Sequence, residues 1–194
     1  MRKASFGACR IALTLGAALT VLLIPASAQA TAPTPVSKRI VLGRSIGGVA
    51  IGQKLSKAKA AWGPGGACIK PASGPPGEPV SRWCDWLLGA NGDRGLASFI
   101  FQGTVVSVTI SLGYDDTGKL YPSSLTALRT DAKIRLGSSA GAVRRAYPRA
   151  GRFTTGTPGA DTDYVIRGTR TRTKTTITVA GRSKKVIRID ISYL

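Results

Sequence analysis

Two serines stand in sequence patterns that are typical of nucleophilic enzymes. Residues 137–141 read Gly-Ser-Ser-Ala-Gly, the G-x-S-x-G pattern of a hydrolase nucleophile elbow, with Ser139 at its centre. Residues 56–59 read Ser-Lys-Ala-Lys, the S-x-x-K pattern of penicillin-binding enzymes, which brings Ser56 and Lys59 to one helical face. Either pattern would supply a serine hydroxyl that attacks a carbonyl carbon.

Neither serine has the companions that this chemistry needs. The chain has no histidine, so a Ser-His-Asp arrangement cannot be assembled around Ser139. The S-D-N and K-T-G motifs that accompany S-x-x-K are missing as well. Ser139 has a sufficient role as the N-cap of a following helix, and Ser56 and Lys59 fit a solvated helix face. We therefore expect a protein that is not an enzyme.

The sequence also offers no pattern for a metal or a cofactor. No cluster of histidine, cysteine, aspartate and glutamate has ligand spacing, and no glycine-rich phosphate loop follows a strand. Asp115 and Asp116 lie in a segment of loop composition, but the other oxygen ligands of a calcium loop do not follow at the required spacing. We interpret this acidic pair as turn chemistry and expect no metal and no cofactor.

The first thirty residues have the pattern of a secretory signal peptide. Arg2, Lys3 and Arg10 precede an apolar run over residues 11–24, and Ala-Gln-Ala follows at residues 28–30. This run is shorter than the roughly 20 residues that a membrane-spanning helix needs, and no later run is as long. We predict cleavage after Ala30, no membrane span, and a secreted or extracytoplasmic protein.

Cleavage would leave two cysteines, Cys68 and Cys84, in an oxidising compartment. An even number of cysteines in an exported chain predicts a disulfide. The enclosed segment is rich in proline and glycine, so closing it should stabilise the fold by about 3 kcal/mol. We expect this bridge to be structural.

The chain is strongly basic. After cleavage, 25 basic residues face 9 acidic ones, which gives a net charge of +16. This charge favours acidic protein surfaces or anionic envelope polymers as partners, while export makes nucleic acid the least expected partner. Residues 31–127 carry +5 and residues 128–194 carry +11. A role of the charge in solubility alone remains open.

One pattern occurs twice and predicts the elements that would position these residues. Residues 49–63 and residues 134–148, 85 positions apart, each hold an apolar pair, a glycine and a helical stretch that ends in an aromatic residue. The apolar positions follow helical spacing in both stretches. They are Leu55, Ala58, Ala61 and Trp62 in the first, and Ala140, Val143, Ala146 and Tyr147 in the second. We interpret Trp62 and Tyr147 as core residues at the helix ends.

Three strand patterns follow each helix, at residues 83–88, 96–102 and 105–112 and at residues 163–167, 173–180 and 186–193. We therefore predict an α+β fold in which two tandem helix-then-antiparallel-strands repeats form one two-layer domain, with short helices on one sheet face. Residues 31–37 would be a tail or linker, residues 38–127 the first repeat and residues 128–194 the second.

Alternation along the strands assigns two faces. One face should form an apolar layer of Phe99, Phe101, Val106, Val108, Ile110, Ile177, Val179, Ile187, Ile189 and Ile191. The opposite face should be neutral in the first repeat and basic in the second, with Arg170, Arg172, Lys174 and Arg188 as candidate binding residues. These cations would either contact an acidic partner or protect an exposed strand from pairing with another chain.

Trp83 is a further candidate on the second face. Alternation places Cys84 and Trp86 on one face of the strand and Trp83 on the other. An exposed tryptophan is a common anchor in protein interfaces, so we include Trp83 among the candidate binding residues.

The recurring glycine, short helix and Trp-Gly or Tyr-Pro, followed by strands, resembles two known groups. These are the secreted β-lactamase-inhibitor proteins and the small SmpA/OmlA-type outer-membrane assembly lipoproteins. The resemblance covers most of the predicted mature chain, and it implies that an open sheet face or its loops bind another protein. Lys54 departs from the pattern, because such helices usually start with serine or threonine, as Ser139 does. No acidic residue that would enter a β-lactamase pocket can be placed, so inhibition is carried over to no residue.

The sequence thus predicts an exported, non-enzymatic binding module. The first hypothesis is that it binds an extracellular or envelope protein through its strand-rich face and loops. The alternative is that it binds anionic cell-envelope polymers through the basic second half.

Overall fold

The computed structural model describes residues 32–69, 81–89, 92–115, 117–154, 157, 159–168 and 172–194. The predicted signal peptide, most of the loop closed by the cysteine pair, and the candidate binding residue Arg170 lie outside these residues. Within the described residues, no helix is long and apolar enough to cross a membrane.

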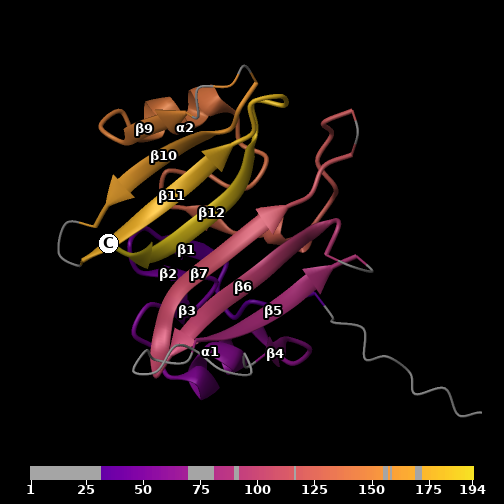
Figure 1. Cartoon of the computed structure of the whole chain (residues 1–194), viewed down its shortest axis with the longest axis vertical. Coiled ribbons are helices and arrows are strands. Elements are labelled where there is room, and N and C mark those ends of the chain that lie inside the picture. Colours follow the sequence, from indigo (N-terminus) through magenta and orange to yellow (C-terminus); the bar gives the residue numbers. More distant parts are fainter. Residues whose placement is uncertain are drawn as a thin grey trace, which may run out of the picture.

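A large antiparallel sheet runs through the whole molecule (Figure 1). Its eight strands follow the order β4-β5-β6-β7-β12-β11-β10-β9, so the closing strands β7 and β12 pair at its centre. The strands are β4 (Ala67–Ile69), β5 (Arg82–Leu88), β6 (Gly95–Gln102), β7 (Thr104–Leu112), β9 (Gly151–Thr154), β10 (Thr162–Arg167), β11 (Thr173–Val179) and β12 (Val186–Tyr193).

A second, smaller sheet and the short helices pack on one face of the large sheet. The small sheet has the order β3-β2-β1-β8, and it lies behind the middle of the large sheet in Figure 1. Strands β2 and β3 and the first helix all contact β7. The bounds are β1 (Arg39–Val41), β2 (Ser45–Ile46), β3 (Val49–Ala50), β8 (Arg129–Thr130), α1 (Leu55–Trp62), α2 (Ala140–Ala146) and the 3₁₀ helix η1 (Ser124–Ala127).

The fold class predicted from the sequence is wrong. The described residues are mostly β, with 44% in strands and 13% in helices. The strands form two sheets, and the fold is not an α+β tandem repeat of helices and strands. The prediction placed only the two short helices on one face of the sheet. Helices of 8 and 7 residues are too short to cover an eight-stranded sheet. Four short strands cover it as well, and three of these have only 2 residues, too few for alternation to reveal.

The buried face of the large sheet is the one that the helices and the small sheet cover. Two β-bulges change which residues point to this side. The register shifts at Ile100/Phe101 and at Thr178/Val179. As a result the buried residues that begin β7 and β12 are Val105 and Val186 rather than the expected Val106 and Ile187, which are half-buried. The other large buried side chains include Trp86, Phe99, Val108, Ile110, Ile177, Ile189 and Ile191.

The core of the first half is aromatic. Trp62 at the end of α1 is fully buried, as the helical spacing predicts, and its indole N–H donates to the carbonyl of Ile46 at 3.2 Å. Its ring packs edge-on against Trp86 with centroids 5.3 Å apart, and Phe99 contacts both tryptophans. Tyr147, the corresponding residue after α2, is half-buried and donates its hydroxyl hydrogen to Thr130.

The segment expected to be a tail contacts the fold. The backbone N–H of Thr34 donates to the carbonyl of Trp62 at 3.0 Å, and that of Val36 donates to Ala61 at 2.9 Å. Pro33 is buried. Residues 32–37 therefore run along the end of α1, where they satisfy two carbonyls that the last turn of a helix leaves without an intrahelical partner.

The predicted disulfide is confirmed. Cys68 on β4 and Cys84 on β5 are direct cross-strand partners and are joined by a disulfide bond. The bridge fixes the three-residue strand β4 to the edge of the large sheet. It thereby holds Ile69, the next residue along β4, opposite Trp83.

Candidate binding face of the large sheet

The candidate site is the outer face of the large sheet, opposite the helices and the small sheet. No described helix or strand covers this face in Figure 1. The strand register arranges its side chains in rows, because directly opposed residues on neighbouring strands point to the same face. One row, which we call the Trp83 row, crosses seven strands. Its members in spatial order are Ile69, Trp83, Ile100, Ser107, Ser192, Lys174 and Arg167.

The first end of the Trp83 row is apolar. Trp83 is 39% exposed and Ile69 is 58% exposed, and half-buried Ile100 lies on the other side of Trp83. The alternation predicted for this strand is confirmed, because Cys84 and Trp86 are fully buried. Sequence reasoning missed Ile69, since a three-residue strand beside a proline-rich loop gives no pattern of its own.

The other end of the Trp83 row is cationic. Lys174 on β11 lies directly opposite Arg167 on β10. Sequence reasoning missed Arg167, although residues 163–167 were predicted as a strand, because the register that places it opposite Lys174 was not predicted. None of the described Lys or Arg side chains on this face forms an ion pair, since the ion pair between Arg39 and Asp131 lies at the small sheet.

The predicted row of Arg170, Arg172 and Lys174 on one strand is only partly described. Strand β11 begins at Thr173, so Arg172 precedes it and is exposed. Arg188 lies opposite Thr178, whereas Lys174 lies opposite Ser192. Arg188 and Lys174 are therefore about 13 Å apart along the strands, because Ser192 is four positions along β12 from Arg188. Lys174 and Arg188 thus both lie on the outer face, at different levels of the sheet.

Asp190 lies between these two cations. It is 9% exposed at the centre of the sheet and accepts hydrogen bonds from the hydroxyls of Ser107 at 3.2 Å and Thr109 at 3.3 Å. Burial raises the pKa of its carboxyl above the ordinary value, against the lowering effects of Arg188, the two hydroxyls and Lys174. The sequence drew attention to the basic residues only, so this central acid was missed.

The other acids of the outer face are also held by hydroxyls on neighbouring strands. Ser98 donates to Asp85 at 2.5 Å, and Thr178 donates to Asp163 at 2.7 Å. These carboxylates therefore make their hydrogen bonds within the sheet. The cations of the same face make no ion pair with them among the described residues.

A shallow hollow of about 460 Å³ lies at one end of the same face. Its lining includes Phe153, Asp163, Thr178 and Arg188. The outer face thus combines an exposed apolar patch, a polar centre and a cationic edge, which are features of surfaces that contact other macromolecules.

The two serines of the apparent catalytic motifs have structural surroundings. Ser139 is the N-cap of α2, and its hydroxyl oxygen accepts from the backbone N–H of Ala142 at 3.2 Å, as predicted. Ser56 and Lys59 are exposed on α1. Lys54, the N-cap residue of α1, makes no side-chain cap hydrogen bond.

Asp115 has the predicted turn role. Its carboxylate accepts from the backbone N–H of Thr117 at 3.0 Å, from the hydroxyl of Thr117 at 2.6 Å and from the N–H of Lys119 at 2.9 Å. The Thr117 hydroxyl is the main cause that lowers the pKa of Asp115. Asp116 lies outside the described residues. Within those residues, no group of three His, Cys, Asp or Glu side chains could hold a metal ion.

Comparison with known proteins adds little to this description. No protein-family model matches the sequence, and no curated protein matches it. Among solved structures, an extracellular protein containing a SCP domain from Bacillus anthracis str. Ames is similar, with a TM-score of 0.42 and 9% sequence identity. The match covers 74% of this chain but only 44% of that protein. So low a likeness supports no argument about fold or function.

Proposed function

We propose that the protein is an exported, non-enzymatic module that binds another protein through the outer face of its large sheet and the loops beside it. The observation that carries this proposal is the apolar end of the Trp83 row. A partly exposed tryptophan between two isoleucines on a sheet face is a typical anchor for a protein partner, because its burial removes a large apolar area from water.

Export is part of the proposal. The signal-peptide pattern of residues 1–30 predicts cleavage after Ala30, and the disulfide between Cys68 and Cys84 fits an oxidising compartment. The partner would then be an extracellular or envelope protein. The resemblance to β-lactamase-inhibitor proteins and SmpA/OmlA-type lipoproteins also implies a protein partner, and it remains a prediction without an assigned inhibitory residue.

A second candidate function is binding of anionic envelope polymers. Arg167, Lys174 and Arg188 favour it, since all three are on the outer face and none forms an ion pair among the described residues. Such binding would rest on long-range charge, so it should fall steeply with salt and vary little with polymer type. Protein binding anchored by Trp83 should survive moderate salt.

A pull-down from envelope extract in a salt series separates the two functions. The triple substitution Arg167→Gln, Lys174→Gln and Arg188→Gln is compared with Lys54→Gln, Lys57→Gln and Lys59→Gln, which removes the same charge from the exposed side of α1. Under the protein-binding proposal, one stoichiometric protein is retained at moderate salt by the wild type and by both triple variants, and Trp83→Ala releases it. The second candidate is supported instead if an anionic polymer is retained only at low salt and only the variant without Arg167, Lys174 and Arg188 fails to retain it.

A further inference from the structure

The edge of the large sheet at β9 and β10 is incompletely paired. Strand β9 has four residues, and its pairing with β10 runs only from Thr154 opposite Thr162 to Gly151 opposite Val165. Strand β10 continues to Ile166 and Arg167. Beyond Gly151, the outer side of β10 therefore has no strand partner among the described residues.

The backbone of Arg167 points to this vacant side. The N–H of Gly168 donates to the carbonyl of Thr173 at 2.8 Å, so Gly168 directs its backbone groups toward β11. In an antiparallel pair, successive residues direct their N–H and C=O groups to opposite neighbours. The N–H and C=O of Arg167 consequently point away from β11. On the unpaired side of β10 they offer one donor and one acceptor to an added strand.

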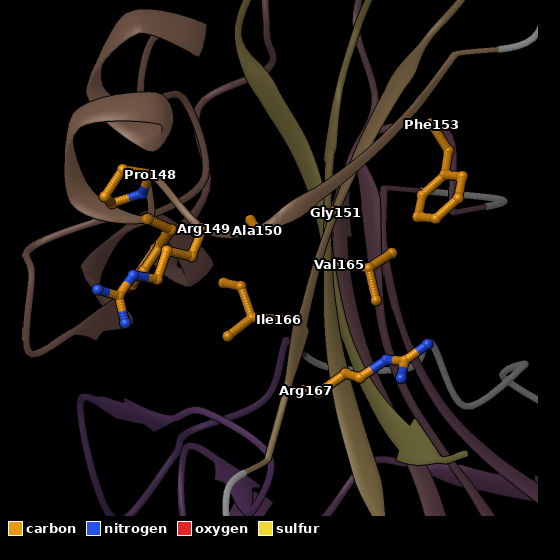
Figure 2. A pocket seen from close by; sticks show the side chains of 9 residues that line it. Pro148, Arg149, Ala150, Gly151, Phe153, Val165, Ile166 and Arg167 are labelled. Carbon is orange, nitrogen blue, oxygen red and sulfur yellow. The ribbon is translucent and has the colours of Figure 1, made fainter.

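A hollow of about 550 Å³ lies along this free edge. Figure 2 shows that its lining wraps around β10: Ile166, with Ala150 and Arg149, lies on the helix side, and Val165, Arg167 and Phe153 lie on the outer side. An extended peptide places alternate side chains on opposite faces. A strand added here would thus put one set of side chains against Ile166 and the other set against Val165.

The positive charge of the residues that line the hollow favours an acidic peptide as the added strand. Two arginines, Arg149 and Arg167, line the hollow, one on each side of β10, and none of the described residues that line it is acidic. A second copy of this edge would bring two more arginines to the same place, which disfavours pairing between identical chains. An acidic side chain on the outer side of an incoming peptide would instead pair with the guanidinium group of Arg167.

We propose that the β9–β10 edge binds an extended segment of a partner protein by strand addition, with apolar side chains on alternate positions and an acidic residue among them. The backbone of Arg167 supplies the hydrogen bonds, Ile166 and Val165 supply apolar contacts on the two sides, and the Arg167 side chain selects an acid on the outer side. This site is at the sheet edge and does not depend on the apolar end of the Trp83 row.

The test uses a defined probe, the peptide acetyl-Thr-Val-Glu-Val-Thr-amide, titrated into the isotope-labelled exported protein at low salt. Amide chemical shifts should change for Gly151, Ile166 and Arg167. A peptide with lysine in place of glutamate should bind about tenfold more weakly or worse. Arg167→Gln should weaken binding of the glutamate peptide by a similar factor. Trp83→Ala should leave it unchanged, which separates this site from the proposed outer-face interaction.

Backbone methylation of the peptide tests the binding mode without altering the protein. Methylating one alternate set of peptide amides removes the donors that face Arg167 and should abolish binding, whereas methylating the other set should not. The proposal is overturned if both methylated peptides bind equally, if the shifts centre on Trp83, or if no shift occurs at roughly 1 mM peptide. It is also overturned if sedimentation shows dimers that use these same amides without peptide, because the occupant is then a second copy.

Discussion

Gly43 and Thr175, 132 residues apart in the chain, connect the small sheet to the large one. The backbone N–H of Gly43 donates to the hydroxyl oxygen of Thr175 at 2.7 Å, and the hydroxyl of Thr173 donates to the carbonyl of Gly43 at 2.7 Å. Gly43 has a φ of 66°, a backbone conformation that favours glycine. The turn between β1 and β2 is thus held on the buried face of β11, which leaves Lys174 on the outer face.

We expect Thr175→Val to lower the free energy of unfolding by about 1–3 kcal/mol, because it leaves the N–H of Gly43 buried without its acceptor. Thr176→Val is the matched control on the outer face, and it should change stability by less than about 0.5 kcal/mol. Chemical denaturation of both variants gives the comparison. Equal effects would show that the link between the sheets contributes little.

Removing the disulfide by Cys68→Ser with Cys84→Ser should lower stability by about 3 kcal/mol, because the unfolded chain regains the freedom of the closed loop. The fold should survive, since a domain of this size usually has more stability than that. Thermal unfolding of the double variant measures the loss. Intact-mass analysis of the exported wild type should detect no free thiol at either position, and two free thiols would contradict the assignment.

Ser139→Ala should cost about 1 kcal/mol through the lost helix cap. Ser56→Ala, at an exposed serine of α1 in the other apparent motif, should change stability by less than about 0.5 kcal/mol. Melting temperatures distinguish the two. If a hydrolytic activity were found and Ser139→Ala abolished it without a change in stability, the structural role assigned to Ser139 would be wrong.

The buried position of Asp190 should make stability depend on pH. Because the fold raises the pKa of this carboxyl above 3.8, the folded state favours its protonated form. Protonation of Asp190 makes its full contribution to the free energy of unfolding below pH 3.8, and this contribution is lost as the pH rises through the folded-state pKa. Asp190→Asn mimics the protonated form, so it should be more stable than the wild type at pH 7, and this advantage should shrink below pH 3.8. A variant less stable than the wild type at pH 7 would contradict this account.

Periodicity over a full turn or strand was enough to predict some of these features. The stripe of Ala58, Ala61 and Trp62 located α1, and alternation around Cys84 placed Trp83 on the outer face. Ser139 was identified because a helix cap depends on local sequence alone. These are features that a short stretch of chain determines by itself.

Features that depend on distant pairing were not predicted. The two-residue strands of the small sheet form only against each other and against the large sheet, so nothing local marks them. The bulge between β6 and β7 moved the first buried position of β7 from the expected Val106 to Val105. The partners Ile69 and Arg167 joined the Trp83 row only through the register of seven strands.

The most direct test of the proposed outer-face function is the affinity of the recovered partner for Trp83→Ala, measured by calorimetry beside Tyr114→Ala. Tyr114 is 48% exposed in the loop after β7, so it is a matched exposed aromatic residue away from the Trp83 row. We predict that Trp83→Ala weakens binding by about 2 kcal/mol, roughly thirtyfold, and that Tyr114→Ala leaves it unchanged. Unchanged affinity of a folded Trp83→Ala variant would contradict the account.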